Sequence, residues 1–226
     1  STMALVAVMS VFNGLEDLIR GLFSSFDSEL QVTPTSGKSF EVTEEWLQAL
    51  RRVEGVEVIT EVIEDNALLE YRGNQHVARV KAVSDNYFEH DRFSKGYFWG
   101  DTTLGDSLRP GALLGRGVAY ALSANLDDIN SVLNIYYPKA PKSAASLDPN
   151  QLYATGQVEP RGFFSIEQGV DNEYVLVPLV FFKELLGYGQ KRTALELKVD
   201  SEHSISTVQK AVQAHLGADF AVKNAD

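Results

Sequence analysis

The sequence VEVITEVIEDNALLEYRGNQHVARVKAV, residues 56–83, is dominated by the β-branched and apolar residues that are typical of strands. Residues 56–63 predict one strand, and residues 67–71 and 76–83 predict two more. The intervening Arg-Gly-Asn at 72–74 is a short turn sequence between apolar runs, which is typical of a hairpin. We therefore expect three strands here, the last two of which form an antiparallel hairpin.

Helices and strands are predicted on both sides of this stretch. Before it, the sequence predicts a strand at 29–35 and a helix that follows the N-cap residue Thr43 and ends at Gly55. Near the other end of the chain, it predicts helices at 179–186 and 204–216 and strands at 194–199 and 220–222. The two ends together predict an α+β layer.

The middle of the chain has a different character and predicts an insertion into that layer. Residues 85–110 are rich in aromatic side chains and in glycine and proline. After them the sequence predicts a helix at 112–122 and strands at 131–137, 152–158, 163–168 and 174–177. Three prolines and several small polar residues between 138 and 150 exclude regular structure there, and long connections of this kind often carry function.

The composition excludes several classes of function. The 226 residues carry a net charge of −11, whereas a protein that binds duplex nucleic acid needs clustered lysine and arginine. The chain has no cysteine, which excludes disulfides, zinc sites built on thiolates and cysteine nucleophiles. We therefore expect no nucleic-acid partner, and the composition leaves the compartment open.

The N-terminal segment predicts one long helix from residue 4 to residue 26. Its apolar residues recur at alternating spacings of three and four, which gives a heptad-like stripe. The stripe packs either in the protein core or against a neighbouring helix. The apolar run 4–12 is shorter than the roughly 20 residues that span a bilayer. It is therefore either the start of a buried helix or the outer end of a transmembrane helix.

The histidines predict no catalytic or metal site. His76, His90, His203 and His215 form no ligand-spaced pair. His90 has an acid on each side, which fits a weak metal site, although a surface turn is the preferred interpretation. No enzymatic activity and no cofactor are expected.

Two further patterns have simple structural interpretations. Gly115-Arg116-Gly117 lacks the remaining residues of a phosphate-binding loop and fits close helix packing better. The adjacent acids Glu44-Glu45 and Asp127-Asp128 point to different faces, and we expect them to be solvated charges.

The opening Ala4-Leu-Val-x-Val-x-Ser-Val-x-Asn13-Gly14-x-Glu16 resembles the end of the first membrane helix in the lipoprotein-releasing permeases of the LolC and LolE type. Those permeases belong to the wider FtsX and MacB class of ABC transporter permeases. The later motifs, which the whole class shares, are Leu114-Gly-Arg-Gly-Val-Ala119 with Leu122, Ile135-Tyr-Tyr-Pro138, and Tyr174-Val-Leu-Val-Pro-Leu179 with Leu185-Leu-Gly187. The resemblance spans most of the chain in order.

The resemblance implies a periplasmic domain of an inner membrane protein, placed between two membrane helices, with residues 4–12 as a truncated transmembrane end. It implies an α+β fold with a Porter-like layer formed by both chain ends and an inserted, mostly β Sabre-like subdomain. On this basis we expect a stem at 1–26, the Porter-like part at 27–85 and 171–226, and the Sabre-like part at 86–170.

The resemblance also implies transport without catalysis. A separate ABC ATPase subunit would hydrolyse ATP in the cytoplasm, and this domain would relay the movement of the membrane helices in a dimeric complex for lipoprotein release. MacB-like efflux and FtsX-like regulation of a cell-wall hydrolase are the alternatives. For the latter, the aromatic residues from Tyr87 to Trp99, with Phe93 and Phe98 among them, would form the docking patch.

In the LolC type, a protruding Sabre hairpin hooks the periplasmic lipoprotein carrier, and residues 138–150 correspond to it by position. The partner-binding residues expected on this basis are Pro138, Lys139, Pro141, Lys142, Leu147 and Pro149. The lysines would steer an acidic partner. The family hook carries bulkier apolar and basic side chains, whereas Leu147 is the one large apolar anchor of this loop. A loop without a binding role is the alternative.

Overall fold

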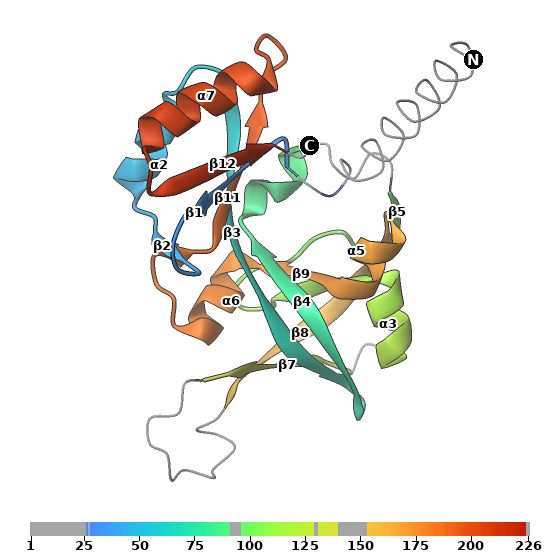
Figure 1. Cartoon of the computed structure of the whole chain (residues 1–226). Helices are drawn as coiled ribbons and strands as arrows, with labels where there is room; N and C mark the ends of the chain where they lie inside the picture. The colour runs from blue at the N-terminus through green and yellow to red at the C-terminus, as the bar shows by residue number, and fades with distance from the viewer. Residues whose placement is uncertain (1–25, 27, 91–95, 129–130, 140–152, 225–226) are drawn as a thin grey trace, which may run out of the picture.

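The computed structural model describes residues 26, 28–90, 96–128, 131–139 and 153–224. The helix predicted for residues 4–26 therefore lies, except for Phe26, outside the described residues. The described part has the predicted α+β composition, with helices packed against one large sheet of mixed strand direction (Figure 1).

The large sheet has ten strands. Nine follow the order β12-β1-β11-β3-β4-β9-β6-β8-β5, and β7 pairs with both β3 and β8. These strands are β1 (Leu30–Pro34), β3 (Val56–Tyr71), β4 (Asn74–Val83), β5 (Tyr97–Gly100), β6 (Gly111–Gly115), β7 (Leu133–Pro138), β8 (Tyr153–Ser165), β9 (Tyr174–Pro178), β11 (Ala194–Val199) and β12 (Phe220–Asn224). A separate small sheet pairs β2 (Phe40–Glu41) with β10 (Lys191–Arg192).

The described residues form six helices, of which two, those at 179–186 and 205–216, begin and end within one residue of the prediction. They are α2 (Glu44–Arg51), the 3-10 helix η1 (Asp85–His90), α3 (Arg116–Leu122), α5 (Gln168–Glu173), α6 (Leu179–Leu186) and α7 (Ile205–Leu216). The Thr43 side chain caps α2 by accepting the Trp46 N–H, and Ser204 caps α7 in the same way. Helix α2 ends at Arg51, before the predicted stop at Gly55. Helices α5 and η1 and strands β2, β5 and β10 were not predicted from the sequence.

The hairpin prediction is confirmed, but the two strands predicted before its turn are one strand. β3 runs without a break from Val56 to Tyr71, and β4 pairs with it from Val62 onwards. The polar residues 64–66 do not end the strand because β4 lies beside them and the Glu64 and Asp65 side chains have partners. Asp65, for example, accepts a hydrogen bond from the Tyr137 hydroxyl at 2.8 Å.

The helix predicted at 112–122 is wrong in its first half. Residues 111–115 form β6, which is buried between β8 and β9, and only Arg116–Leu122 are helical. A short apolar run fits a buried strand as well as a buried helix, so periodicity cannot separate the two. The strands predicted at 152–158 and 163–168 are also one strand, β8.

The sheet separates cores on its two faces. Ile59 and Ile63 of β3 point to one face, where α2 and α7 cover one half of the sheet and α3 and α6 cover the other. Val62 points to the opposite face, which carries Phe26, η1 and α5. Phe26 therefore lies on the face of the sheet that the long helices leave uncovered.

The two ends of the described chain lie side by side. Leu30, at the start of β1, pairs with Asn224, at the end of β12. The hairpin of β7 and β8 lies at the opposite end of the molecule (Figure 1). The long strands β3 and β4 run between these two ends.

Candidate functional site

The predicted hook is joined to an antiparallel strand pair. Pro138, the last residue of β7, pairs with Tyr153, the first residue of β8, and both Pro138 and Lys139 are exposed. Outside the described residues lie Pro141, Lys142, Leu147 and Pro149. The structure thus has the base of a hairpin at the expected position, and the binding role of the six residues stays a prediction.

This hairpin base is fastened to β3 by two tyrosines. The Tyr136 hydroxyl donates to Glu70 at 2.9 Å, and the Tyr137 hydroxyl donates to Asp65 at 2.8 Å. The hydrogen bond to Glu70 raises the pKa of Tyr136, whereas burial, followed by the bond to Asp65, raises the pKa of Tyr137. Both phenols therefore remain neutral donors at physiological pH, and β7 is held firmly against β3.

A buried ion pair lies at the other end of the molecule, beneath Phe26. The Lys81 ammonium on β4 lies 2.8 Å from the Glu196 carboxylate on β11, and the two side chains are only 3% and 1% exposed. Because β3 lies between these strands, the pair bridges across it. The ammonium also lies 4.5 Å from the centre of the Phe26 ring, a cation–π contact. This site was not predicted from the sequence, although Lys81 and Glu196 are charged residues inside predicted apolar strands.

Phe26 also reaches a second group of polar side chains through Tyr174. The two rings lie 4.8 Å apart, and the Tyr174 hydroxyl donates to Glu64 at 3.3 Å and accepts from Arg79 at 3.1 Å. Burial raises the pKa of Glu64, and the nearby Lys81 opposes this increase. Phe26, the ion pair and Glu64 therefore form one continuous cluster on this face of the sheet.

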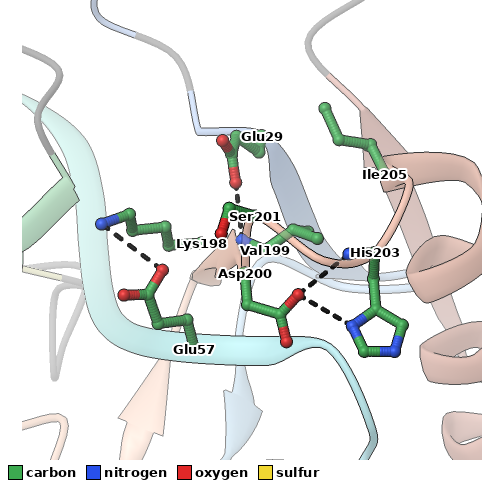
Figure 2. Close-up of a pocket in the computed structure, with 8 residues that line it drawn as sticks. All are labelled: Glu29, Glu57, Lys198, Val199, Asp200, Ser201, His203 and Ile205. Atoms are coloured by element: carbon green, nitrogen blue, oxygen red, sulfur yellow. Dashed lines mark hydrogen bonds and ion pairs between the residues drawn. The ribbon is translucent and has the colours of Figure 1, made fainter.

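A polar pocket of about 510 Å³ lies near the start of β1 (Figure 2). Its carboxylates already have intramolecular partners. Glu29 accepts the Val199 N–H at 2.5 Å, Glu57 pairs with Lys198 at 3.4 Å, and Asp200 bonds to the His203 ring at 2.8 Å. Because these groups hold the ends of β1, β3 and β11 together, we assign them a structural role.

His203 in this pocket makes stability dependent on pH. Its hydrogen bond to Asp200, and then the nearby Glu54, raise its pKa. A histidine with a raised pKa in the folded state stabilises the fold below its unfolded pKa of about 6.5, and this stabilisation is lost as the pH rises through the folded value. We therefore expect His203→Gln to lower the urea midpoint at pH 6 and to change it little at pH 9.

Asp200→Asn provides the matched control for that measurement. In the Asp200→Asn background the effect of His203→Gln at pH 6 should shrink, because the main partner of the imidazolium is gone. An equal loss of stability at pH 6 and pH 9 would show that packing, and not charge, explains the effect of His203.

The prediction of a surface turn at His90 is wrong. The His90 side chain is buried, and its Nε2 lies 2.7 Å from the Thr60 hydroxyl on β3. η1 folds back onto β3, where Asn86 also donates to the Ile59 carbonyl. Among the described residues, no group of three or more histidine and acidic side chains is placed to hold a metal ion.

The prediction that the two acidic pairs are solvated charges is wrong for Asp128. Glu44, Glu45 and Asp127 are exposed, as expected for solvated charges, and Glu44 also pairs with the exposed Arg51 over 3.2 Å. Asp128 instead forms an ion pair with Arg72, at the tip of the β3–β4 hairpin, over 2.7 Å. The loop after α3 is thereby tied to the hairpin turn.

The glycines around Arg116 are packing residues, as predicted. A Cβ atom at Gly115 would lie 2.3 Å from the Asp171 carbonyl oxygen, and one at Gly117 would lie 1.9 Å from the Asn172 side chain. Helix α3 therefore approaches α5 more closely than an alanine would allow.

This close approach predicts a loss of stability on Gly115→Ala. The new methyl group meets backbone rather than a flexible side chain, so α5 must shift, at an expected cost of about 1–3 kcal/mol of unfolding free energy in urea denaturation. Gly169→Ala in α5 is the control, because its nearest neighbour is 3.8 Å away. Equal effects of the two replacements would contradict the packing role.

The aromatic middle of the chain is divided between the core and the surface. Tyr87 is fully buried, whereas Tyr97 is 73% and Trp99 is 44% exposed on β5. The Arg116 guanidinium lies 5.9 Å from the centre of the Trp99 ring. Phe93 lies outside the described residues. Of the described aromatic side chains of this stretch, Phe88, Tyr97 and Trp99 are exposed, and the exposed Arg116 of α3 lies beside Trp99.

Comparison with solved structures shows the same fold in three transporter domains. The periplasmic region of MacB from Actinobacillus actinomycetemcomitans aligns with a TM-score of 0.60 at 11% identity, over 89% of this chain and 91% of that one. The extracellular domain of the noncanonic ABC-type transporter YknZ from Gram-positive bacteria gives 0.56 at 15% identity, over 87% and 99%. A domain of a putative permease from Porphyromonas gingivalis gives 0.51 at 11% identity, over 89% and 91%.

The sequence comparisons place the chain in a family. No curated protein matches the sequence. In the described ranges, no helix combines the length and apolar character that crossing a bilayer requires. The family model of the MacB-like periplasmic core domain matches residues 1–215, so this chain belongs to the MacB-like family of periplasmic domains of ABC transporter permeases.

Proposed function

We propose that the domain relays movement between the membrane helices and a periplasmic partner in a lipoprotein-releasing ABC transport complex, with ATP hydrolysis in a separate cytoplasmic subunit. The observation that carries the proposal is the burial of Phe26 on the Lys81–Glu196 pair. Phe26 is the last residue of the stem that the sequence predicts. The side-by-side chain ends also suit a domain placed between two membrane helices.

Contacts of Phe26 connect the stem to strands on both sides of β3. Its ring contacts Lys81 on β4, Phe164 on β8 and Tyr174 on β9, and Lys81 continues the connection to Glu196 on β11. A displacement of the stem therefore reaches both halves of the sheet. From there β3 extends to β7 and to the hairpin base at the far end of the molecule.

The Lys81–Glu196 ion pair is better suited to acting as a joint that transmits movement between strands than to stabilising the fold. Removing two charges from water costs several kcal/mol per ion, so buried pairs are weak sources of stability. Their attraction is directional, however, and it fixes β4 relative to β11. Such a joint transmits displacement, because the strands cannot slide without separating two charges in a buried environment.

The relay is tested in the full-length permease, assembled with its ATPase in proteoliposomes. We expect Phe26→Ala to leave ATP hydrolysis in place and to lower lipoprotein transfer per ATP on the order of tenfold. Phe40→Ala is the matched control, since Phe40 packs with Trp46 and Phe220 away from the stem. Equal transfer per ATP in both variants would overturn the relay.

The same proposal assigns carrier binding to the hairpin after β7. Pro138, Lys139, Pro141, Lys142, Leu147 and Pro149 are the proposed contact residues. Titration calorimetry with the lipoprotein carrier of the same organism should show binding to the chain and none after deletion of residues 139–150. Failure of both forms to bind would favour MacB-like efflux or FtsX-like regulation, and binding by both would remove the hook role from this hairpin.

A second candidate function rests on the exposed side chains of β5. Tyr97, Trp99 and Arg116 belong to the residue types that dominate binding energy at interfaces. An FtsX-like role would place a cell-wall hydrolase on this patch. Tyr97→Ala with Trp99→Ala should then abolish hydrolase activation, whereas unchanged activation would exclude this role.

The proposal also keeps the division of the chain into a stem (1–26), a Porter-like part (27–85 and 171–226) and a Sabre-like part (86–170), within a dimeric complex. The core that contains Leu47 and Val208 consists only of residues of the proposed Porter-like part, which supports the division. The core that contains Leu69 and Leu133 draws on both parts. β9, assigned to the Porter-like part, lies between β4 and β6, so one sheet continues across the division.

A further inference from the structure

One edge of the large sheet is closed by side chains. In the described part of the chain β12 pairs with β1 alone, and its other side faces α7. The Val222 N–H donates to Gln213 Oε1 at 3.0 Å, and Gln213 Nε2 donates to the Phe220 carbonyl at 2.9 Å. Gln209 Nε2 donates to the Val222 carbonyl at 2.9 Å. The side chains of Gln209 and Gln213 thus occupy three backbone hydrogen-bonding groups of β12 that point away from β1.

The two glutamines reproduce what a neighbouring strand would offer. A side-chain amide has both a carbonyl acceptor and N–H donors, like a peptide unit. Gln209 and Gln213 are four residues apart in α7, so they project from the same face of the helix, towards β12. An exposed strand edge is a template for pairing with another chain, and these amides satisfy it from within.

Space for an incoming strand lies directly beside this edge. A groove of about 530 Å³ is lined by both glutamines and Val222. Its remaining lining residues are Lys210, Ala214, Gly217 and Ala218, all of which are exposed and most of which are small. Rotation of the two glutamines into this groove would uncover the backbone groups of β12.

We propose that the β12 edge is a strand-pairing surface for a second copy of this chain, and that Gln209 and Gln213 hold it closed. The strand is complementary to itself in the antiparallel direction. With Val222 on a two-fold axis, its outward N–H and C=O groups meet those of the second Val222. In this register Lys223 lies opposite Ala221, so that no like charges oppose each other. The proposal is independent of the transport function.

The test compares self-association of the chain with and without the two amides. Sedimentation equilibrium of Gln209→Ala with Gln213→Ala should show a dimer that forms at least about tenfold more tightly than in the original chain, because several hydrogen bonds become available between copies. Hydrogen exchange of the Val222 amide should be faster than in the original chain at low concentration and should slow as the dimer forms.

Two further variants separate edge pairing from general loss of structure. Val222→Pro, added to the double variant, should restore the monomer, since the Val222 N–H points away from β1 and its removal blocks the new pairing. Gln48→Ala with Gln157→Ala removes two exposed glutamines elsewhere and should remain monomeric.

Two results with the double variant would overturn the proposal. One is a folded double variant that stays monomeric at every concentration, and the other is a dimer that survives Val222→Pro. If the double variant does not fold, Gln209→Ala alone removes one of the three bonds and is measured in the same way. A folded, concentration-independent monomer of that variant, with unchanged exchange at Val222, also overturns the proposal.

Discussion

Lys81→Met is expected to lower the free energy of unfolding by about 3–5 kcal/mol, because it leaves the Glu196 carboxylate buried without its cation. The cost comes mainly from the carboxylate that remains, since a charge in a dry interior is strongly disfavoured. Lys81 also lowers the pKa of Glu64, so its removal should raise that pKa further. Urea denaturation of the chain at pH 7 measures the loss.

The double variant Lys81→Met with Glu196→Leu is the decisive comparison. Replacing a complete buried pair by apolar side chains of similar volume is often neutral or stabilising, so most of the lost stability should return. Such recovery would establish that the pair is not retained for stability, which is the premise of the relay. A double variant as unstable as the sum of both single variants would contradict it.

The second large effect is expected at Phe164, the fully buried aromatic residue of β8. Phe164→Ala should cost about 3–5 kcal/mol, because it removes a ring from the core that also contains Phe26, Leu113 and Leu176. The Phe26 ring lies 6.2 Å away, centre to centre, so the stem loses one of its contacts as well. Thermal or urea unfolding gives the magnitude.

Phe164→Leu is the matched control, since it keeps an apolar side chain at the site and should cost substantially less. A double-mutant cycle between Phe26→Ala and Phe164→Ala should give a non-zero coupling energy of about 0.5–1.5 kcal/mol, as expected for aromatic rings in contact. Strict additivity would show that Phe26 and Phe164 do not share one core.

Patterns that depend on neighbours along the chain could be predicted from the sequence. Thr43 caps α2 as expected, because an N-cap bonds to a backbone group only three residues away. The turn between β3 and β4 also forms as expected, with Arg72 and Gly73 at positive φ angles of 51° and 85°. The motifs of the resemblance led to the transporter class, which the family match confirms.

Predictions were wrong or were not made for residues whose structural partners lie far away in the sequence. Residues 111–115 become a strand because β8 and β9, far along the chain, are there to pair with them. His90 is buried because η1 returns to β3, next to Thr60. No residue close in the sequence to the segment 111–115 or to His90 indicates which strands will lie beside them.

The buried Lys81–Glu196 pair is the clearest example of a contact that could not be predicted from the sequence. The sequence places a lysine at 81 and a glutamate at 196, each inside an apolar strand, and so predicts two charges that are costly to bury. That they neutralise each other depends on the strand order, which puts β4 and β11 on either side of β3 and brings residues 115 positions apart to 2.8 Å. Local hydrogen bonds and the spacing of apolar residues determine the secondary-structure elements and their caps. The pairing of strands depends on residues that are far apart in the sequence, and it determines which charges meet and where Phe26 is held.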